Sequence, residues 1–184
     1  INNSRTGILD VLKKMNSKII LKNKSIYKGE PIADIEIKSE DSLKSVNCNS
    51  SINSRMIDEF LIIFLICAKA KGISSFKKLG ELRNKESDRL KIAVNFLKMI
   101  GVKIINKSNN LKIYGNPNLN LKGNYVIKNY KKDHRVFMMS CIAALTLGGT
   151  WKIHDKDSIN SSFPNFLSIM KNVGAKIKWV NLKI

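Results

Sequence analysis

Leu97-Lys-Met-Ile-Gly-Val-Lys-Ile-Ile105 is the stretch that decides the fold, because two other segments of the chain repeat its pattern. Leu12-Lys-Lys-Met-Asn-Ser-Lys-Ile-Ile20 and Ile169-Met-Lys-Asn-Val-Gly-Ala-Lys-Ile177 align with it without gaps. In each copy the apolar spacing changes from helical to alternating, and the residue at the change tolerates a left-handed backbone: Asn16, Gly101 or Gly174. Each copy is therefore expected to be a helix end that leads into a strand.

Two longer apolar stretches, Met56 to Ala70 and Asp133 to Leu147, lie between these copies. Both open on acidic residues and continue almost wholly apolar, which predicts helices that are buried on most sides. Short strands are expected after them and in the alternating stretches, at residues 33–38, 73–76, 110–114, 124–127 and 150–154. Three units of strand, helix, strand, helix, strand and strand would form one α/β lobe over residues 1–184, with the first unit cut short.

The composition favours a soluble protein of one domain, with 184 residues and 43% hydrophobic content. The longest apolar run, residues 60–68, is too short to cross a bilayer, and no secretory signal pattern opens the chain. Three cysteines without metal-ligand spacing fit a reducing compartment. We therefore expect a cytoplasmic protein with no membrane partner.

The net charge of +19 raises the alternative of a basic nucleic-acid-binding module, whose binding would depend steeply on salt. The chain has 28 lysines and 5 arginines, and the lysines are spread along it rather than clustered. No basic segment with interleaved aromatic residues is present to stack bases. The charge therefore favours small anionic substrates over nucleic acid.

The segment with the most candidate catalytic and binding residues is Glu81-Leu-Arg-Asn-Lys-Glu-Ser-Asp-Arg-Leu90. Lys85, Glu86 and Arg89 are expected within one turn at the start of a helix that runs to about residue 100, with both cations on one face. Two cations and free N–H groups could hold a phosphate or carboxylate, with Glu86 as a proton donor or acceptor. The alternative is a solvated first turn with ordinary Glu–Lys pairs.

Two further segments place charged residues at the start of the apolar helices. Arg135, in Asp133-His-Arg135, could reach the same anion pocket, because arginine binds a carboxylate or phosphate with two parallel hydrogen bonds. Asp58 could bind sugar-like hydroxyls or accept a proton from one of them. For both segments, simple capping of a helix is the competing interpretation.

At these residues the chain resembles the 5-enolpyruvylshikimate-3-phosphate synthases. Residues 81–89 are similar to that family's Glu-Leu-Arg-Val-Lys-Glu-Ser-Asp-Arg signature, and Asp133-His-Arg135 resembles its second signature. The segments Asn3-Ser-Arg-Thr-Gly7, Met56-Ile-Asp-Glu59 and Ser161-Ser-Phe-Pro-Asn-Phe166 resemble further family segments in the same order. The resemblance covers nearly the whole chain.

The resemblance implies an inside-out α/β barrel lobe, with buried helices and outer sheets, that closes on a second lobe over the substrates. It also implies transfer of an enolpyruvyl group from phosphoenolpyruvate to the 5-hydroxyl of shikimate 3-phosphate, with no metal or organic cofactor. Asp58 would hold the shikimate hydroxyls and act as the base, and Glu86 would be the acid–base group at C3. Lys85 would contact both substrates and stabilise the departing phosphate, while Arg89 and Arg135 would clamp phosphoenolpyruvate.

Two departures from the family accompany this resemblance. Ser161 stands where some members carry a lysine that contacts phosphoenolpyruvate. The motifs of the N-terminal lobe are absent, and the chain opens on Ile1, so we expect a nearly complete C-terminal lobe that is inactive alone. The full-length enzyme is expected to be a monomer. The sister UDP-N-acetylglucosamine enolpyruvyl transferase and a degenerate structural fragment are the remaining alternatives.

Overall fold

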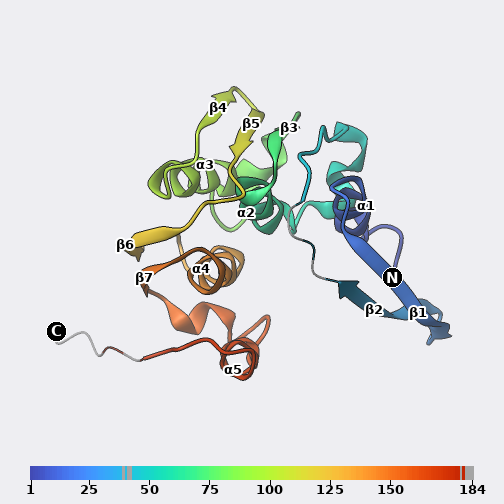
Figure 1. Ribbon diagram of the computed structural model, residues 1–184. Coiled ribbons are helices and arrows are strands. Elements are labelled where there is room, and N and C mark those ends of the chain that lie inside the picture. The colour runs from blue at the N-terminus through green and yellow to red at the C-terminus, as the bar shows by residue number, and fades with distance from the viewer. Residues whose placement is uncertain (39, 41–42, 179, 181–184) are drawn as a thin grey trace. The chain divides into compact units, whose positions relative to one another are not determined.

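The computed structural model describes residues 1–38, 40, 43–178 and 180. The chain divides into two compact units, residues 1–121 and residues 122–184, and both contain helices and strands (Figure 1). The mixed content confirms the expected α/β class. The single lobe expected over residues 1–184 stays a prediction.

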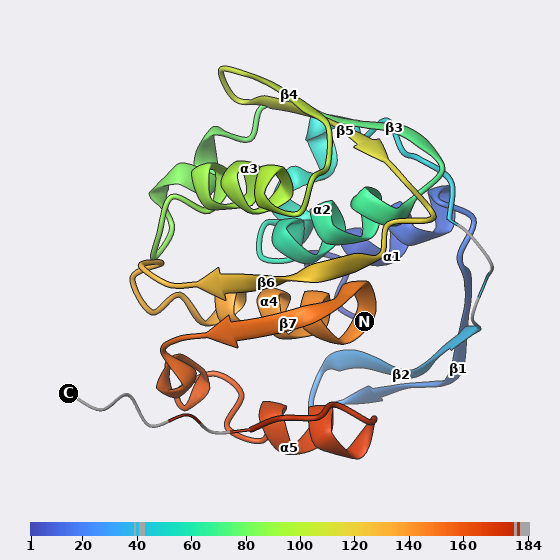
Figure 2. The same ribbon diagram turned by 60° about the vertical axis from the view of Figure 1, so that its left-hand side comes forward.

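Among its described residues, the first unit contains three α-helices, two 3-10 helices and five strands. In chain order these are α1 (Gly7–Lys14), β1 (Lys18–Tyr27), β2 (Glu30–Lys38), η1 (Ser50–Met56), α2 (Phe60–Lys69), β3 (Gly72–Phe76), η2 (Gly80–Asn84), α3 (Arg89–Met99), β4 (Ile104–Lys107) and β5 (Asn110–Gly115). The strands β1 and β2 form an antiparallel hairpin, and β5 lies between β3 and β4 in an antiparallel sheet (Figure 2). In the described part of this unit, β1 and β2 therefore form one antiparallel sheet and β3, β5 and β4 form another.

The core of the first unit is centred on α2, which is buried along nearly its whole length as its apolar sequence predicts. The ring of Phe64 lies 5.4 Å from that of Phe60 and 5.0 Å from that of Phe76 on β3. Tilted pairs such as the first and edge-to-face pairs such as the second add to the free energy gained by burying their surface. The helix begins at Phe60 rather than Met56, so Asp58 and Glu59 precede its first turn instead of lying within it.

The three repeated segments do end helices through a left-handed residue. Asn16 has φ 70°, Gly101 has φ 77° and Gly174 has φ 101°. The first two copies lead into β1 and β4 as expected. The strand expected after the third copy is wrong, because residues 175–178 are not in a strand. Alternation alone does not make a strand, since its backbone also needs a hydrogen-bonding neighbour.

The second unit contains the strand pair β6 (Leu121–Ile127) and β7 (Gly148–Ile153), the helix α4 (His134–Leu147), the 3-10 helix η3 (Lys156–Ile159) and α5 (Phe166–Asn172). The side chains of α4 that are buried include Val136, Phe137 and Met139, as its apolar sequence predicts. Of the helices in the described ranges, none has both the length and the apolar character needed to cross a membrane.

Burial of Cys67 in α2 makes the stability of the first unit depend on pH. Burial raises the pKa of this thiol to about 12, and a hydrogen bond with Ser74 offsets only part of the rise. An unfolded thiol has a pKa near 8.5, so between these values the unfolded chain loses a proton that the folded chain keeps. The contribution of Cys67 to the free energy of unfolding should thus be fully present below about pH 8.5 and fall by about 1.4 kcal/mol per pH unit above it.

Urea unfolding of the wild type and the Cys67→Ala variant between pH 8 and pH 10.5 measures this effect. The difference between the two proteins isolates Cys67 from the lysines and tyrosines that titrate in both. We expect the wild type to lose stability more steeply with rising pH than the variant. Parallel pH profiles would contradict the prediction.

Candidate active site

Arg89 is the centre of the charged cluster in the first unit. It is the first residue of α3, and its side chain is only 1% exposed. Its Nη1 atom lies 3.2 Å from Oδ1 of Asp58, and its Nη2 atom lies 2.5 Å from Oε2 of Glu86. The guanidinium therefore joins two carboxylates that come from different segments of the chain.

Asp58 lies between η1 and α2 and accepts from a second arginine. Nη1 of Arg5 is 3.3 Å from Oδ2 of Asp58, whereas Arg89 binds the other oxygen. The side chain of Asp58 is 25% exposed and that of Glu86 is 52% exposed, so both carboxylates are open to solvent beside a buried guanidinium. A ligand could thus reach both carboxylates.

The placement of Lys85 and Glu86 corrects the expectation of a single helical turn. The helix α3 begins at Arg89, and the side chain of Asp88 caps it by accepting from the N–H of Lys91 at 2.8 Å. Lys85 has an extended backbone after η2, with φ −93° and ψ −167°. Because Asp88 caps the helix, the residues before it lie outside α3, and Lys85 and Arg89 do not share a helix face.

Lys85 has a carboxylate partner of its own. Its Nζ atom lies 3.3 Å from Oε1 of Glu81, and its side chain is 25% exposed. The spacing of four residues was expected to place Lys85 and Arg89 on one helix face. The ion pair with this spacing is instead the one between Glu81 and Lys85. Within the first unit, the structure therefore brings Asp58, Glu86 and Arg89 into direct contact and pairs Lys85 beside them with Glu81.

Arg135 lies in the second unit, in the first turn of α4. Its backbone N–H donates to Oδ1 of Asp133 at 3.0 Å, so Asp133 caps this helix as Asp88 caps α3. Asp133 is buried, and Arg135 is partly exposed. Ser161 lies in the same unit, in the turn between η3 and α5. Pro164 precedes α5 by two residues.

The cluster is balanced in charge. Arg5 and Arg89 face Asp58 and Glu86, and Lys85 faces Glu81. An anion that binds Arg89 must therefore compete with carboxylates already in place. Because those carboxylates are partly exposed, water can solvate them when they are displaced, which lowers the cost of the exchange.

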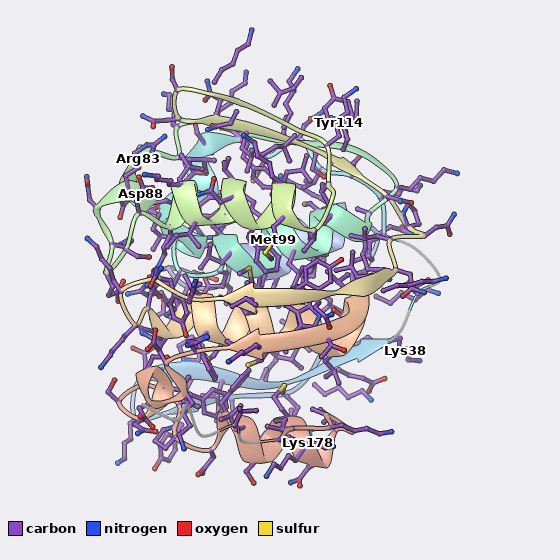
Figure 3. All side chains as sticks on the ribbon, turned by 90° about the vertical axis from the view of Figure 1, so that its left-hand side faces the viewer. Lys38, Arg83, Asp88, Met99, Tyr114 and Lys178 are labelled. Carbon is purple, nitrogen blue, oxygen red and sulfur yellow. The ribbon has the colours of Figure 1, made fainter. Side chains whose placement is uncertain are left out.

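Arg83, which lies in the signature segment, has a structural role. Its guanidinium donates to Oδ1 of Asn109 at 3.0 Å, to the carbonyl of Ser108 at 3.2 Å and to Oδ2 of Asp88 at 3.0 Å. Figure 3 shows Arg83 and Asp88 together at the N-terminal end of α3, opposite the end that carries Met99. The arginine thus ties the cap of α3 to the turn between β4 and β5.

Replacement of Arg83 by alanine should lower the free energy of unfolding by about 1 kcal/mol, because three hydrogen bonds are lost from a partly exposed side chain. This corresponds to a fall in the thermal midpoint of about 2–4 °C. Arg83→Lys should not restore stability, since one ammonium cannot match the planar fork of arginine. Thermal unfolding measures the change. Lys91→Ala, an exposed change on the same helix, is the control, and equal midpoints in all three variants would contradict the prediction.

Sequence reasoning gave no role to Arg5 or Arg55. Arg55 donates to the carbonyl of Asn3 at 2.6 Å, to Oδ2 of Asp10 at 2.8 Å and to Oγ1 of Thr6 at 3.4 Å, so it fixes the segment that carries Arg5. The signal that could have found both residues is the rarity of arginine in a chain with 28 lysines. An arginine in such a chain indicates a position where a planar guanidinium with several hydrogen-bond donors is needed and a lysine ammonium cannot replace it.

Comparison with known families gives a match over residues 1–170 to the model of EPSP synthase (3-phosphoshikimate 1-carboxyvinyltransferase). A 3-phosphoshikimate 1-carboxyvinyltransferase of Thermosynechococcus vestitus is 38% identical over 94% of this chain and 38% of that protein. One of Zymomonas mobilis is 37% identical over 97% of this chain and 40% of that protein. The chain spans about 40% of the length of these relatives.

Solved structures give the same result. EPSP synthase from Acinetobacter baumannii superimposes with a TM-score of 0.87 and 29% identity, over 98% of this chain and 41% of that protein. The enolpyruvyl transferase NikO from Streptomyces tendae superimposes with a TM-score of 0.67 at 15% identity, over 94% of this chain and 36% of that one. The second likeness supports the fold alone, which is the α/β enolpyruvyl transferase fold.

Proposed function

Because this chain belongs to the EPSP synthase (3-phosphoshikimate 1-carboxyvinyltransferase) family, we propose that it is the C-terminal lobe of an enzyme that transfers the enolpyruvyl group of phosphoenolpyruvate to shikimate 3-phosphate. A second, N-terminal lobe would complete the active site. The contact of Arg89 with both Asp58 and Glu86 carries this proposal. A buried cation in contact with two carboxylates can bind an anion beside groups that transfer protons.

In the first step, the 5-hydroxyl of shikimate 3-phosphate adds to C2 of phosphoenolpyruvate while C3 gains a proton. Asp58 takes the proton of the hydroxyl, and Glu86 supplies the proton to C3. In the second step, the tetrahedral intermediate loses phosphate and one C3 proton, which Glu86 accepts. Glu86 is suited to this exchange because its side chain is half exposed at the edge of the cluster.

Arg89 and Arg135 would bind the anionic groups of phosphoenolpyruvate, and Lys85 would contact both substrates and stabilise the departing phosphate. Prearranged cations of this kind usually supply a large share of the lowering of the barrier. Binding of phosphoenolpyruvate to Arg89 would take the place of Glu86 on the guanidinium. The released carboxylate is then available for proton transfer at C3.

We also propose that the complete enzyme is a monomer of the cytoplasm that uses no cofactor. The sister transferase and the nucleic-acid-binding module are not favoured. The relatives with 36–38% identity carry the 3-phosphoshikimate name rather than that of the sister transferase. The arginines of the first unit bind carboxylates, carbonyls and side-chain oxygens rather than forming an open basic face for nucleic acid.

Complementation of a bacterial strain that lacks EPSP synthase tests the proposed function. The chain would be expressed together with the N-terminal lobe of the Thermosynechococcus vestitus relative, on medium without aromatic amino acids. We expect growth with both lobes and none with either lobe alone. Failure to grow, with both lobes present in soluble form and bound to each other, would count against the proposal.

A further inference from the structure

We propose that Arg5 is a positioning residue that holds Asp58 when Arg89 binds phosphoenolpyruvate. This inference rests on the proposed function, because it assigns Arg5 a place in the same reaction. Its starting point is the division of one carboxylate between two arginines. Arg5 binds Oδ2 of Asp58 at 3.3 Å, and Arg89 binds Oδ1 at 3.2 Å.

The two arginines differ in burial and in the number of contacts. The side chain of Arg89 is 1% exposed and has two carboxylate partners, whereas that of Arg5 is 64% exposed. Among the described residues, the guanidinium of Arg5 contacts the carboxylate of Asp58. Arg89 is thus the cation that the two carboxylates share and that a bound substrate would contact, whereas among the described residues Arg5 binds Asp58.

The backbone around Arg5 is fixed by contacts inside the first unit. The N–H of Arg5 donates to the carbonyl of Asn2 at 2.9 Å, and the N–H of Ser4 donates to Oδ1 of Asn2 at 2.9 Å. Arg55 anchors this turn through its 2.6 Å bond to the carbonyl of Asn3 and its bond to Asp10. Hydrogen bonds therefore fix the turn that carries Arg5, although the side chain of Arg5 is largely exposed.

Binding of phosphoenolpyruvate would redistribute these contacts. A carboxylate or phosphate that engages the fork of Arg89 competes with Asp58 and Glu86 for the same N–H groups. Release of Glu86 serves the reaction, because Glu86 must reach C3. Release of Asp58 from Arg89 would hinder the reaction, because a base that turns away from the attacking hydroxyl is no longer aligned to accept its proton. The bond to Arg5 keeps Asp58 in place at that moment.

The predicted consequence is an effect of Arg5 on turnover rather than on binding of phosphoenolpyruvate. Misplacement of a catalytic group by about 1 Å can cost about 100-fold in rate. When this chain is mixed with the N-terminal lobe of a relative and phosphate release is measured, Arg5→Ala should lower kcat about 10–100-fold, with the KM for phosphoenolpyruvate within about twofold of wild type. Arg5→Lys should recover part of the loss, because it keeps a cation near Oδ2. Lys24→Ala removes one exposed charge from the same unit and is the matched control.

A second measurement tests the inference without turnover. Three-bond couplings measured by NMR report the χ1 rotamer of Asp58 in this chain with saturating phosphoenolpyruvate. We expect one rotamer in the wild type and in Arg5→Lys, and averaged couplings in Arg5→Ala. Because Arg5 is exposed, the alanine variant should fold with an unchanged thermal midpoint.

The outcomes separate this inference from the proposed function. An inactive wild-type mixture of lobes contradicts the proposed function, and the rotamer measurement then decides the role of Arg5. A fixed Asp58 rotamer in Arg5→Ala, or an unchanged kcat, overturns the positioning role. A raised KM for phosphoenolpyruvate with an unchanged kcat also overturns it, because that result would make Arg5 a direct substrate ligand.

Discussion

Replacement of Glu86 by glutamine should lower phosphate release by about 100- to 10,000-fold while leaving the fold intact, because general acid–base catalysis contributes about that much to rate. The amide matches the carboxylate in shape, and its oxygen can still accept from Arg89, but it cannot deliver or take a proton at C3. Since Glu86 is 52% exposed, the free energy of unfolding should change by less than about 0.5 kcal/mol.

The KM for phosphoenolpyruvate gives a second readout in the Glu86→Gln variant. A neutral amide competes less well than a carboxylate for the buried guanidinium, so phosphoenolpyruvate should bind at least as tightly as in the wild type. Steady-state kinetics of the mixed lobes measure kcat and the KM for phosphoenolpyruvate together. Glu36→Gln is the same change on the β1–β2 hairpin, away from the cluster, and should leave kcat and KM unchanged. Turnover of Glu86→Gln within tenfold of wild type would contradict the assigned role.

Replacement of Arg89 by alanine should reduce both activity and stability. Loss of one prearranged donor usually costs about 100- to 1,000-fold in rate, and Arg89 is proposed to contact phosphoenolpyruvate directly. The change also leaves Asp58 and Glu86 without their shared cation and opens a void at a side chain that is 1% exposed. Because both carboxylates can be hydrated, the loss of stability should be about 1–3 kcal/mol, below that of breaking a fully buried pair.

Arg89→Lys separates the charge from the geometry. A lysine keeps the positive charge but cannot donate to two carboxylates in the planar arrangement of the guanidinium. It should therefore recover part of the stability and little of the activity. Thermal unfolding and steady-state kinetics on the same preparations measure both. If Arg89→Lys had the turnover and the KM of wild type, the planar guanidinium of Arg89 would not be needed. The proposed binding of phosphoenolpyruvate by this guanidinium would then be wrong.

The sequence predicts the helices best where a local physical rule determines them. The left-handed residues Asn16, Gly101 and Gly174 end their helices as the repeat predicts, since few residues other than glycine and asparagine adopt that conformation readily. The burial of α2 also follows from its sequence, because a helix that is apolar on all sides is stable only inside a core.

The start of α3 could not be fixed from spacing alone. Residues 80–84 form a 3-10 helix, and a short segment of this kind has no strong periodic signal. Asp88 is a good N-cap, but a signature dense in charged residues offers several candidate caps. Lys85 and Glu86 were therefore assigned to a helix that begins only after them.

The contacts of the site depend on residues that are distant in sequence. Arg89 is 31 residues from Asp58, and Arg5 is 53 residues from it. Resemblance to the family implied that Asp58, Glu86 and Arg89 act in one site, but it did not indicate that one guanidinium binds both carboxylates. The contact between Arg5 and Asp58 became visible only in the fold, which places the guanidinium of Arg5 beside this carboxylate.

Phosphate release from phosphoenolpyruvate and shikimate 3-phosphate, measured after this chain is mixed with the N-terminal lobe of a close relative, tests the central claim most directly. We predict phosphate release that requires both lobes and both substrates, and that is lost in Glu86→Gln and Arg89→Ala. No phosphate release from a confirmed complex of the two lobes, or release that persists in both variants, would contradict the assignment of this chain to enolpyruvyl transfer.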